Sequence, residues 1–477
     1  MNLYVIIVVT LVVTCSLNWI VPNSYGETNQ QNLQNDFLPV LKDTNLKIEV
    51  IATGLNFPTK MTFLDEKNIL VSQKYDGKVI LIKNFEVQPN SVLDLNVDGF
   101  FERGLVGLES VNFKNKKYVF VYYTESGINK DTFDEKILNN NGNKLVRYEW
   151  DGKTLVNPSL ILQPMSNSGI MHIGGATAIL DDSIFLVVGD NLISSSLTNR
   201  PQFSLSLIKL YCIDDFLGNF CLDIVSNYFW MALNGDPAES LIKDNGVIFR
   251  VNFDGDAVNS NPFVKSQLSK YYGYGIRNSY GLAIDPLTKN LWDTENGPDR
   301  YDEINLVVPG MNSGWQLTMG PDNKTQFSDH DKLTYFEGSE YSNPEFSWKF
   351  TVAPTAIEFL KSKQYGVDLE NDVFVGDVHG RLYHFELNEN RDAFEFKDSR
   401  LQDFVVDNEQ EMEEIIFGEN LGIITDIKTG PDGFLYIVSM VKTDIPSWLV
   451  WAGNERNSEI TEKAEMMGVI FRIVPQN

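Results

Sequence analysis

A few loops of this sequence carry residue types that could do chemistry. His172 lies in the glycine-rich stretch "MHIGGATAIL", and Asp190 follows it in "VVGDN". Imidazole is the side chain that best moves a proton near physiological pH, and a carboxylate can hold it in place. Arg277 and Asn278 occur together in "YGYGIRNSYGLAIDP". Structural roles compete with these, because a histidine in a glycine-rich loop is often structural and an Arg-Asn pair can join strands by hydrogen bonds.

The cysteines give no sign of a metal site. If the N-terminal leader is removed, only Cys212 and Cys221 remain, and no C-x-x-C spacing is present. Outside the reducing cytosol they could form a disulfide, and equally they could be two small buried apolar residues.

The elements that must position the polar loops recur along the chain. Six units share a small residue or proline, an apolar pair, an Asp or Asn near a turn and a hydrophobic run; they begin near Gly54, Gly104, Gly174, Tyr280, Pro354 and Ile424. Their short runs, rich in Val, Ile, Phe and Tyr, predict β-strands and almost no helix. We therefore predict an all-β fold, a six-bladed β-propeller. The pentapeptide GVIFR, at 246–250 and 468–472, would form equivalent strands of the third and sixth blades.

One interval between the units is much longer than the others. Its excess lies in residues 191–245 and includes the helix-like run "FLGNFCLDIVSNYFWMAL". We expect a partly helical insertion there, which either covers a site or packs against the propeller rim. No linker is evident after residue 45, so residues 45–477 are predicted to form one propeller domain.

The N-terminus and the charge indicate an exported protein. Residues 1–26 read as a secretory signal peptide, with an uncleaved membrane anchor as the alternative, and residues 27–44 read as a polar linker. We expect the protein to be secreted or extracytoplasmic. The net charge of -26 repels nucleic acid and anionic membranes, so the expected partner is a neutral small molecule or a cation, and any membrane contact would run through the anchor.

Several motifs together resemble the glucose/sorbosone dehydrogenases. The family pattern G-H-R-N-x-x-G-L-A, then E-x-G-P-x-x-x-D-E-I-N and G-x-N-x-G-W, matches "YGYGIRNSYGLAIDP" and "WDTENGPDRYDEINLVVPGMNSGW", with Ile276 in place of the histidine. "FFERGLVGL", "MHIGGATAIL…VVGDN" and "WKFTVAPT" resemble three further family segments. The resemblance covers nearly all of residues 45–477 apart from the insertions. It implies a secreted six-bladed propeller that uses pyrroloquinoline quinone (PQQ) with calcium.

The resemblance also implies roles for individual residues. His172 would be the general base that takes a sugar hydroxyl proton while hydride moves to the quinone, Asp190 would orient His172, and Arg277 would stabilise charge developing on the cofactor. The other implied positions are Asn278, Asn296, Trp348, Thr351 and His379 around the cofactor, Gly297 and Pro298 as backbone carbonyl ligands of Ca²⁺, and Glu102 beside the substrate.

This sequence departs from the family where PQQ carboxylates are anchored. His379 stands near the position of a family lysine, and Ile423 and Thr425 replace two arginines of a G-R-x-R-D segment. Ala176 also replaces an arginine. Because PQQ carries three carboxylates, cationic side chains would be its main anchors, and the lysine and the two G-R-x-R-D arginines are missing here.

Three functions follow from this pattern. The first is oxidation of an aldose or related hydroxyl compound by hydride transfer to PQQ with calcium, with an unknown electron acceptor. The second is a non-catalytic binding propeller that has lost the cofactor anchors. The third is a calcium-dependent, lactonase-like hydrolase, which would require several carboxylates that converge on the central channel of the propeller.

Overall fold

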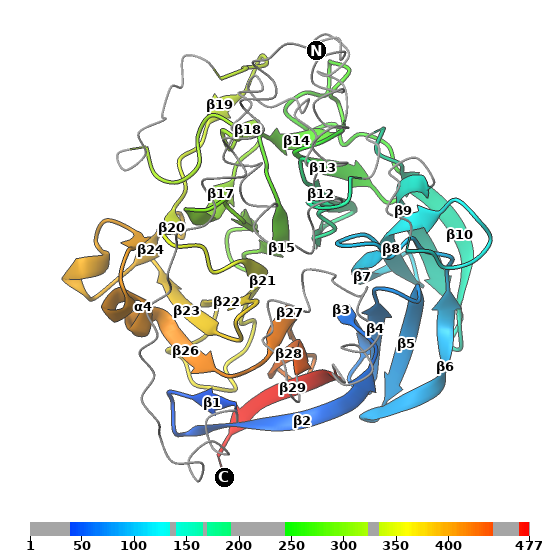
Figure 1. Ribbon diagram of the computed structural model, residues 1–477, viewed down its shortest axis with the longest axis horizontal. Helices are drawn as coiled ribbons and strands as arrows, with labels where there is room; N and C mark the ends of the chain where they lie inside the picture. Colours follow the sequence, from blue (N-terminus) through cyan, green and yellow to red (C-terminus); the bar gives the residue numbers. More distant parts are fainter. Residues whose placement is uncertain are drawn as a thin grey trace, which may run out of the picture. The chain divides into compact units, whose positions relative to one another are not determined.

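Short strands account for almost all of the regular structure in this computed structural model (Figure 1). The structure describes residues 39–133, 140–165, 169–191, 244–322, 333–441 and 467–476. The leader, Cys212, Cys221 and nearly all of the expected insertion at 191–245 lie outside the described residues. Within them, α4 (Glu409–Ile415) is the one α-helix, and a 3-10 turn spans Ser399–Leu401. None of the described helices has the length and apolar character needed to cross a membrane.

The described strands form six sheets that follow the chain order of the predicted units. The first contains β3 (Pro58–Asp65), β4 (Asn68–Gln73), β5 (Lys78–Lys83) and β6 (Glu86–Asp94). The second contains β7 (Leu105–Phe113), β8 (Lys116–Ser126), β9 (Asn140–Trp150) and β10 (Leu155–Leu162). The third runs from β11 (Thr177–Leu180) through β12 (Ser183–Val188), β13 (Val247–Asn252) and β14 (Tyr271–Tyr274) to β18 (Met311–Asn312) and β19 (Glu340–Tyr341).

The other three sheets complete the series. The fourth contains β15 (Ser279–Ile284), β16 (Leu291–Glu295), β17 (Asp302–Val307), β20 (Phe346–Trp348) and β25 (Val405–Val406). The fifth contains β21 (Pro354–Phe359), β22 (Val373–Asp377), β23 (Leu382–Leu387), β26 (Ile416–Glu419) and β1 (Val40–Leu41), with β24 (Phe394–Glu395) beside β23. The sixth contains β27 (Ile423–Thr429), β28 (Leu435–Val441), β29 (Met467–Pro475) and β2 (Leu46–Leu55).

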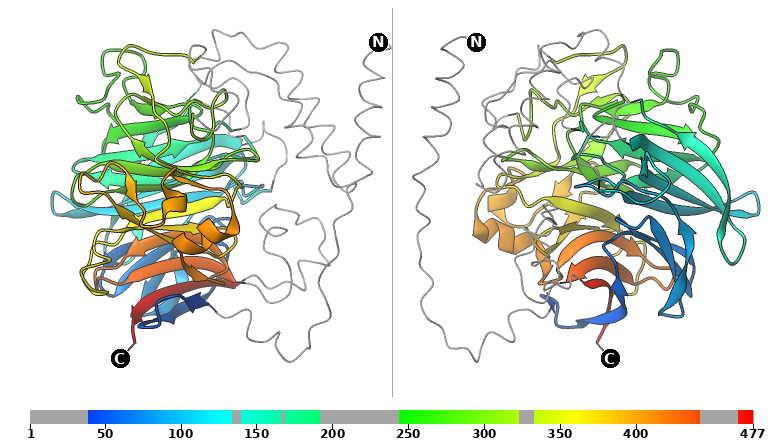
Figure 2. Two further views of the ribbon diagram at one scale, coloured as in Figure 1. Left: turned by 90° about the vertical axis from the view of Figure 1, so that its left-hand side faces the viewer. Right: turned by 45° about the vertical axis from the view of Figure 1, so that its right-hand side comes forward.

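The first strands of the sheets close a ring. Each of β3, β7, β11, β15 and β21 contacts the first strand of the next sheet, and β27 contacts β3. The ring is also joined through the chain ends, because β2 pairs antiparallel with β29, placing Val50 opposite Phe471 (Figures 1 and 2). The predicted all-β propeller is therefore confirmed.

The two GVIFR segments occupy matching places in their sheets. The first lies in β13 and the second in β29, and each is the third strand of its sheet. Their Val, Ile and Phe side chains are at most 4% exposed, so both segments fill the spaces between neighbouring sheets. Arg250 and Arg472 end the two pentapeptides, and Arg472 pairs with Glu49 at 2.7 Å. The repeat reflects equivalent positions in a repeated sheet.

Candidate active site

The polar residues singled out in the sequence lie on loops at one end of the ring. His172 precedes β11 and Asp190 follows β12, whereas Arg277 precedes β15 and Asn296 follows β16. Since the first two strands of each sheet are antiparallel, the start of one and the end of the other lie at the same edge. The propeller thereby brings residues of separate sheets to a common end.

His172 and Asp190 form a buried pair. Nδ1 of His172 lies 2.6 Å from Oδ1 of Asp190, and both side chains are at most 3% exposed. The indole Nε1 of Trp315 donates to Oδ2 of the same carboxylate at 2.6 Å. No described residue hydrogen-bonds to Nε2 of His172. A carboxylate on Nδ1 holds the proton there and leaves the lone pair on Nε2, which is the arrangement a base requires.

Arg277 contacts this pair through its backbone and contacts Trp315 and Asn296 through its guanidinium. The backbone N–H of Asp190 donates to the Arg277 carbonyl at 2.8 Å. The Arg277 guanidinium lies 5.3 Å from the Trp315 ring centre, and its Nη1 donates to the Asn296 carbonyl at 2.7 Å. Glu295 accepts the Arg277 backbone N–H at 2.6 Å. Burial, followed by the charge of Asp293, raises the pKa of Glu295.

A glycine allows the loops to meet. A Cβ at Gly189 would lie 2.4 Å from the His172 carbonyl oxygen and 2.8 Å from that of Arg277. Any side chain there would push the His172 and Arg277 loops apart, so the "VVGDN" glycine sets the spacing of the site.

Glu102 joins the site from the loop that precedes β7 of the second sheet. Its Oε2 accepts the backbone N–H of His172 at 2.5 Å and the hydroxyl of Tyr280. Burial, together with the neighbouring Glu102 charge, raises the pKa of Tyr280 well above its usual value, so Tyr280 stays a donor. Oε1 of Glu102 is buried and has no partner among the described residues.

Four buried polar atoms of this cluster lack a hydrogen-bond partner within the described residues. They are Glu102 Oε1, Arg277 Nε, Asn278 Oδ1 and Asn296 Oδ1. Burying unpaired polar atoms is costly, so several in one place indicate a site that a polar ligand completes.

The loop that carries the implied calcium ligands is tied to the start of the fifth sheet. The N–H of Gly297 donates to Asp302 Oδ1 at 2.7 Å, and Asp302 Oδ2 accepts the N–H groups of Val352 and Ala353 at 2.6 and 2.7 Å. Gly297 and Pro298 are half-buried. No group of three metal-binding side chains occurs in the described part of the chain, so a cation here would depend on backbone carbonyls.

Three residues implied to contact the cofactor make no hydrogen bond to the His172 cluster within the described residues. Trp348 is fully buried in the core, with ring centres of Phe346 and Tyr383 4.9 and 5.2 Å away. Thr351 and His379 are exposed. Aromatic side chains of the core therefore already occupy the surroundings of the Trp348 ring.

The positions of the missing arginines are filled by other interactions. Ile423 is fully buried in an apolar cluster with Val378 and Met440. Thr425 is half-buried and its hydroxyl donates to the Pro58 carbonyl at 3.0 Å. Lys428, a nearby cation, instead pairs with Glu109 at 2.7 Å.

Sequence reasoning did not assign site roles to Trp315, Tyr280 or Glu295. All three stand in segments that resemble the family motifs, so the signal was present in the spacing. Their side chains could equally have been core, and only their contacts with Asp190, Glu102 and Arg277 place them in the site.

Comparison with known families fits this arrangement. A family model described as glucose/sorbosone dehydrogenase matches residues 55–206 and 231–444. The chain belongs to this family. Named relatives include the aldose sugar dehydrogenase YliI of Escherichia coli, 29% identical over 262 residues that cover 53% of this chain and 65% of the relative. Quinoprotein glucose dehydrogenase B of Acinetobacter calcoaceticus is 26% identical over 285 residues, 58% of this chain and 54% of the relative.

Solved structures of the family share the fold. The soluble aldose sugar dehydrogenase of E. coli in its apo-form has a TM-score of 0.60 at 19% identity, over 90% of this chain and 100% of that one. The PQQ-bound aldose sugar dehydrogenase of Streptomyces coelicolor has a TM-score of 0.56 at 19% identity, over 91% of this chain and 100% of that one. At this level of identity the likeness concerns the propeller itself.

Proposed function

We propose that this member of the glucose/sorbosone dehydrogenase family oxidises a hydroxyl group of a sugar or related alcohol, with PQQ and Ca²⁺ as cofactors. The observation that carries the proposal is the His172–Asp190 pair, whose backbone bonds to Arg277 and whose Nε2 has no hydrogen-bond partner among the described residues. When bound, the calcium-polarised quinone would accept the hydride from the substrate carbon.

The chain's own residues supply the proton chemistry. Nε2 of His172 takes the hydroxyl proton, and the Asp190 carboxylate stabilises the imidazolium that forms. Trp315 holds the second oxygen of Asp190 and so fixes the direction of the imidazole. The Arg277 guanidinium provides positive charge next to the reacting atoms. Oε1 of Glu102 accepts a hydrogen bond from a second substrate hydroxyl.

The residues present fit the reacting side of the cofactor better than its carboxylate side. Arg277, Asn278 and Asn296 each offer a buried polar atom that lacks a partner among the described residues, and the half-buried residues Gly297 and Pro298 would offer backbone carbonyls to the cation. At the carboxylate side, Ile423 offers no charge and Thr425 bonds to the backbone. We therefore expect weaker PQQ binding than a site with both arginines would give.

The test is a PQQ titration of purified protein in the presence of Ca²⁺, followed by dye-linked turnover on a panel of sugars. His172→Ala should abolish turnover. His384→Ala is the matched control, because His384 forms a comparable pair with Asp372 at 2.8 Å on β23, away from the cluster. The control should retain turnover.

Two outcomes would overturn the proposal. Absence of saturable binding at tens of micromolar PQQ would exclude PQQ as the cofactor, and the remaining function would be the non-catalytic binding propeller. Turnover that survives in His172→Ala would show that His172 is not the general base.

We further propose that the protein is exported. The support is the apolar leader over residues 1–26 and the strongly acidic composition. Fractionation of the source cells, with N-terminal sequencing of the mature chain, tests this. Recovery of intact residues 1–26 in a soluble cytosolic fraction would contradict it.

A further inference from the structure

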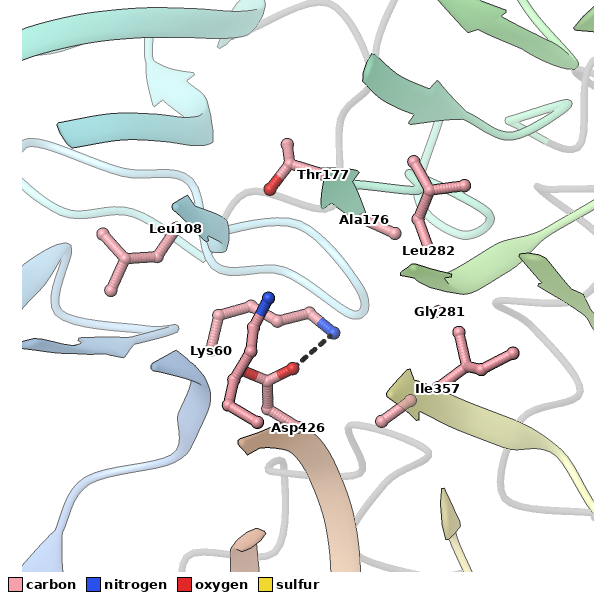
Figure 3. Close-up of a pocket in the computed structure, with 10 residues that line it drawn as sticks. Lys60, Leu108, Ala176, Thr177, Gly281, Leu282, Ile357 and Asp426 are labelled. Atoms are coloured by element: carbon pink, nitrogen blue, oxygen red, sulfur yellow. Dashed lines mark hydrogen bonds and ion pairs between the residues drawn. The ribbon is translucent and has the colours of Figure 1, made fainter. Parts of the chain in front are cut away.

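The first strands of the six sheets line a central pocket that contains charged side chains. Lys60 and Asp426 point toward one another across it from β3 and β27 (Figure 3). Lys428 also lines the pocket and pairs with Glu109. The remaining lining side chains are mostly apolar: Leu108, Leu282 and Ile357, among others. Charged groups in such a place need specific partners.

The ammonium of Lys60 is held by backbone oxygens of three other sheets. Nζ donates to the carbonyls of Tyr280, Thr425 and Thr355 at 2.9, 3.2 and 3.5 Å. Oδ1 of Asp426 lies 3.5 Å from the same nitrogen, and the Lys60 side chain is 11% exposed. Burial lowers the pKa of Lys60, while the Asp426 charge opposes that shift. One ammonium thus joins the first, fourth, fifth and sixth sheets, as a bound cation would.

Tyr280 connects this ammonium to the candidate active site. Its carbonyl accepts from Lys60, and its hydroxyl donates to Glu102, whose carboxylate in turn accepts the backbone N–H of His172. Fixing the Tyr280 backbone therefore fixes its ring, the Glu102 carboxylate and the His172 loop in sequence.

We propose that Lys60 is a positioning residue, which sets the placement of His172 from the central pocket through Tyr280 and Glu102. Its effect on turnover rests on the proposed function, whereas its effect on the geometry of His172 does not. If Lys60 only joined the sheets, replacing it would lower the stability of the protein without moving the His172 imidazole.

The experiment follows the imidazole signals by ¹⁵N-edited NMR of the full chain without cofactor. The protein has four histidines, so single His→Ala variants assign the signals. Lys60→Met is compared with Lys428→Met, which removes the other pocket ammonium but no described bond to Tyr280. His384 is the internal reference.

The expected result is a displaced His172 signal in Lys60→Met, with the His384 signal unmoved. Lys428→Met should leave both signals in place. An unmoved His172 signal in Lys60→Met, or an equal movement in Lys428→Met, would overturn the proposal. A displaced signal in a protein that neither binds PQQ nor oxidises sugars would leave this proposal standing and remove only the proposed function.

A second variant covers the case in which Lys60→Met does not fold. Lys60→Ala is refolded with propylammonium chloride, which returns an ammonium to the vacated position. The Tm of Lys60→Ala should rise saturably with propylammonium chloride, relative to the same concentration of tetramethylammonium chloride. The Tm of the wild type should not respond to propylammonium. The His172 signal of the variant should return to its wild-type position. Failure of propylammonium to raise the Tm, or to restore the signal, would overturn the proposal.

Discussion

Nδ1 of His172 lies 2.6 Å from Oδ1 of Asp190, although 18 positions separate the two residues in the chain. The pair is formed because the loop before β11 and the end of β12 meet at one edge of the third sheet. Trp315, which follows β18 in the chain, donates from its indole nitrogen to Oδ2 of Asp190. Both oxygens of the Asp190 carboxylate are therefore engaged, and the imidazole is oriented through Asp190 before any ligand binds.

Replacing Asp190 by Asn should remove the proper tautomer of His172. The amide can donate to Nδ1 and thereby shift the ring proton to Nε2, where the base needs a lone pair. We expect kcat of dye-linked turnover to fall by about 10²–10⁴-fold, with the melting temperature nearly unchanged. Asp372→Asn at the His384 pair is the control, and equal losses in both variants would contradict the assignment.

Gly189→Ala should destabilise the protein by steric conflict. The added methyl group would lie 2.4 Å from the His172 carbonyl oxygen, so one loop must move, at a cost of about 1–3 kcal/mol. Gly273→Ala is the matched control, because its nearest neighbour would lie at an ordinary 3.4 Å. Thermal unfolding of both variants measures the difference, and a smaller loss at Gly189 than at Gly273 would refute the expectation.

Thr425→Arg should strengthen PQQ binding. The substitution supplies a cation where the family places one, and a charge-assisted hydrogen bond of about 1.5 kcal/mol corresponds to roughly tenfold in Kd. Thr429→Arg changes the other end of β27 and should leave Kd unchanged. Calorimetric titration with Ca²⁺ present compares the two. Equal affinities in the two variants would show that position 425 does not face the cofactor.

Asp293→Asn should stabilise the protein, and more so at high pH. Asp293 is fully buried on β16, both carboxylate oxygens lack partners among the described residues, and burial raises its pKa. A carboxyl group with a raised pKa in the folded state contributes stability at low pH that is lost as the pH rises through that pKa.

The Asn variant cannot ionise and therefore avoids this loss. We expect a gain in the free energy of unfolding of about 1–3 kcal/mol at pH 8 and a smaller gain at pH 5. Melting curves at both pH values check the sign. Asp182→Asn, at an exposed turn, is the control and should show no such dependence. A gain that shrinks from pH 5 to pH 8 would contradict the assignment.

The sequence predicted the strands and their repetition well. GVIFR combines β-forming side chains with a leading glycine, the other strand runs are likewise rich in β-forming side chains, and such local preferences are readable without knowledge of the partner strand. The six units then imply a ring, because each sheet must bury its faces against neighbours. The positions of His172, Asp190, Arg277 and Asn278 next to strand ends were also readable, since their motifs adjoin the predicted strands.

Tertiary packing decided which side chains face the site. Trp315 and Trp348 both stand in family-like segments, yet packing directs Trp315 to Asp190 and encloses Trp348 among Phe346 and Tyr383. No local pattern distinguishes them, because the difference lies in what neighbouring sheets leave unoccupied.

Lys60 shows the same limit most clearly. Its ammonium partners lie 220, 295 and 365 positions further along the chain, and no spacing rule links residues so far apart. The sequence by itself determined the strands, their repeat and the loops that carry the polar motifs, since these follow from short-range preference. Only the closed ring decided that one lysine of the first sheet reaches Tyr280 in the fourth, because ring closure brings distant strands together around the same pocket.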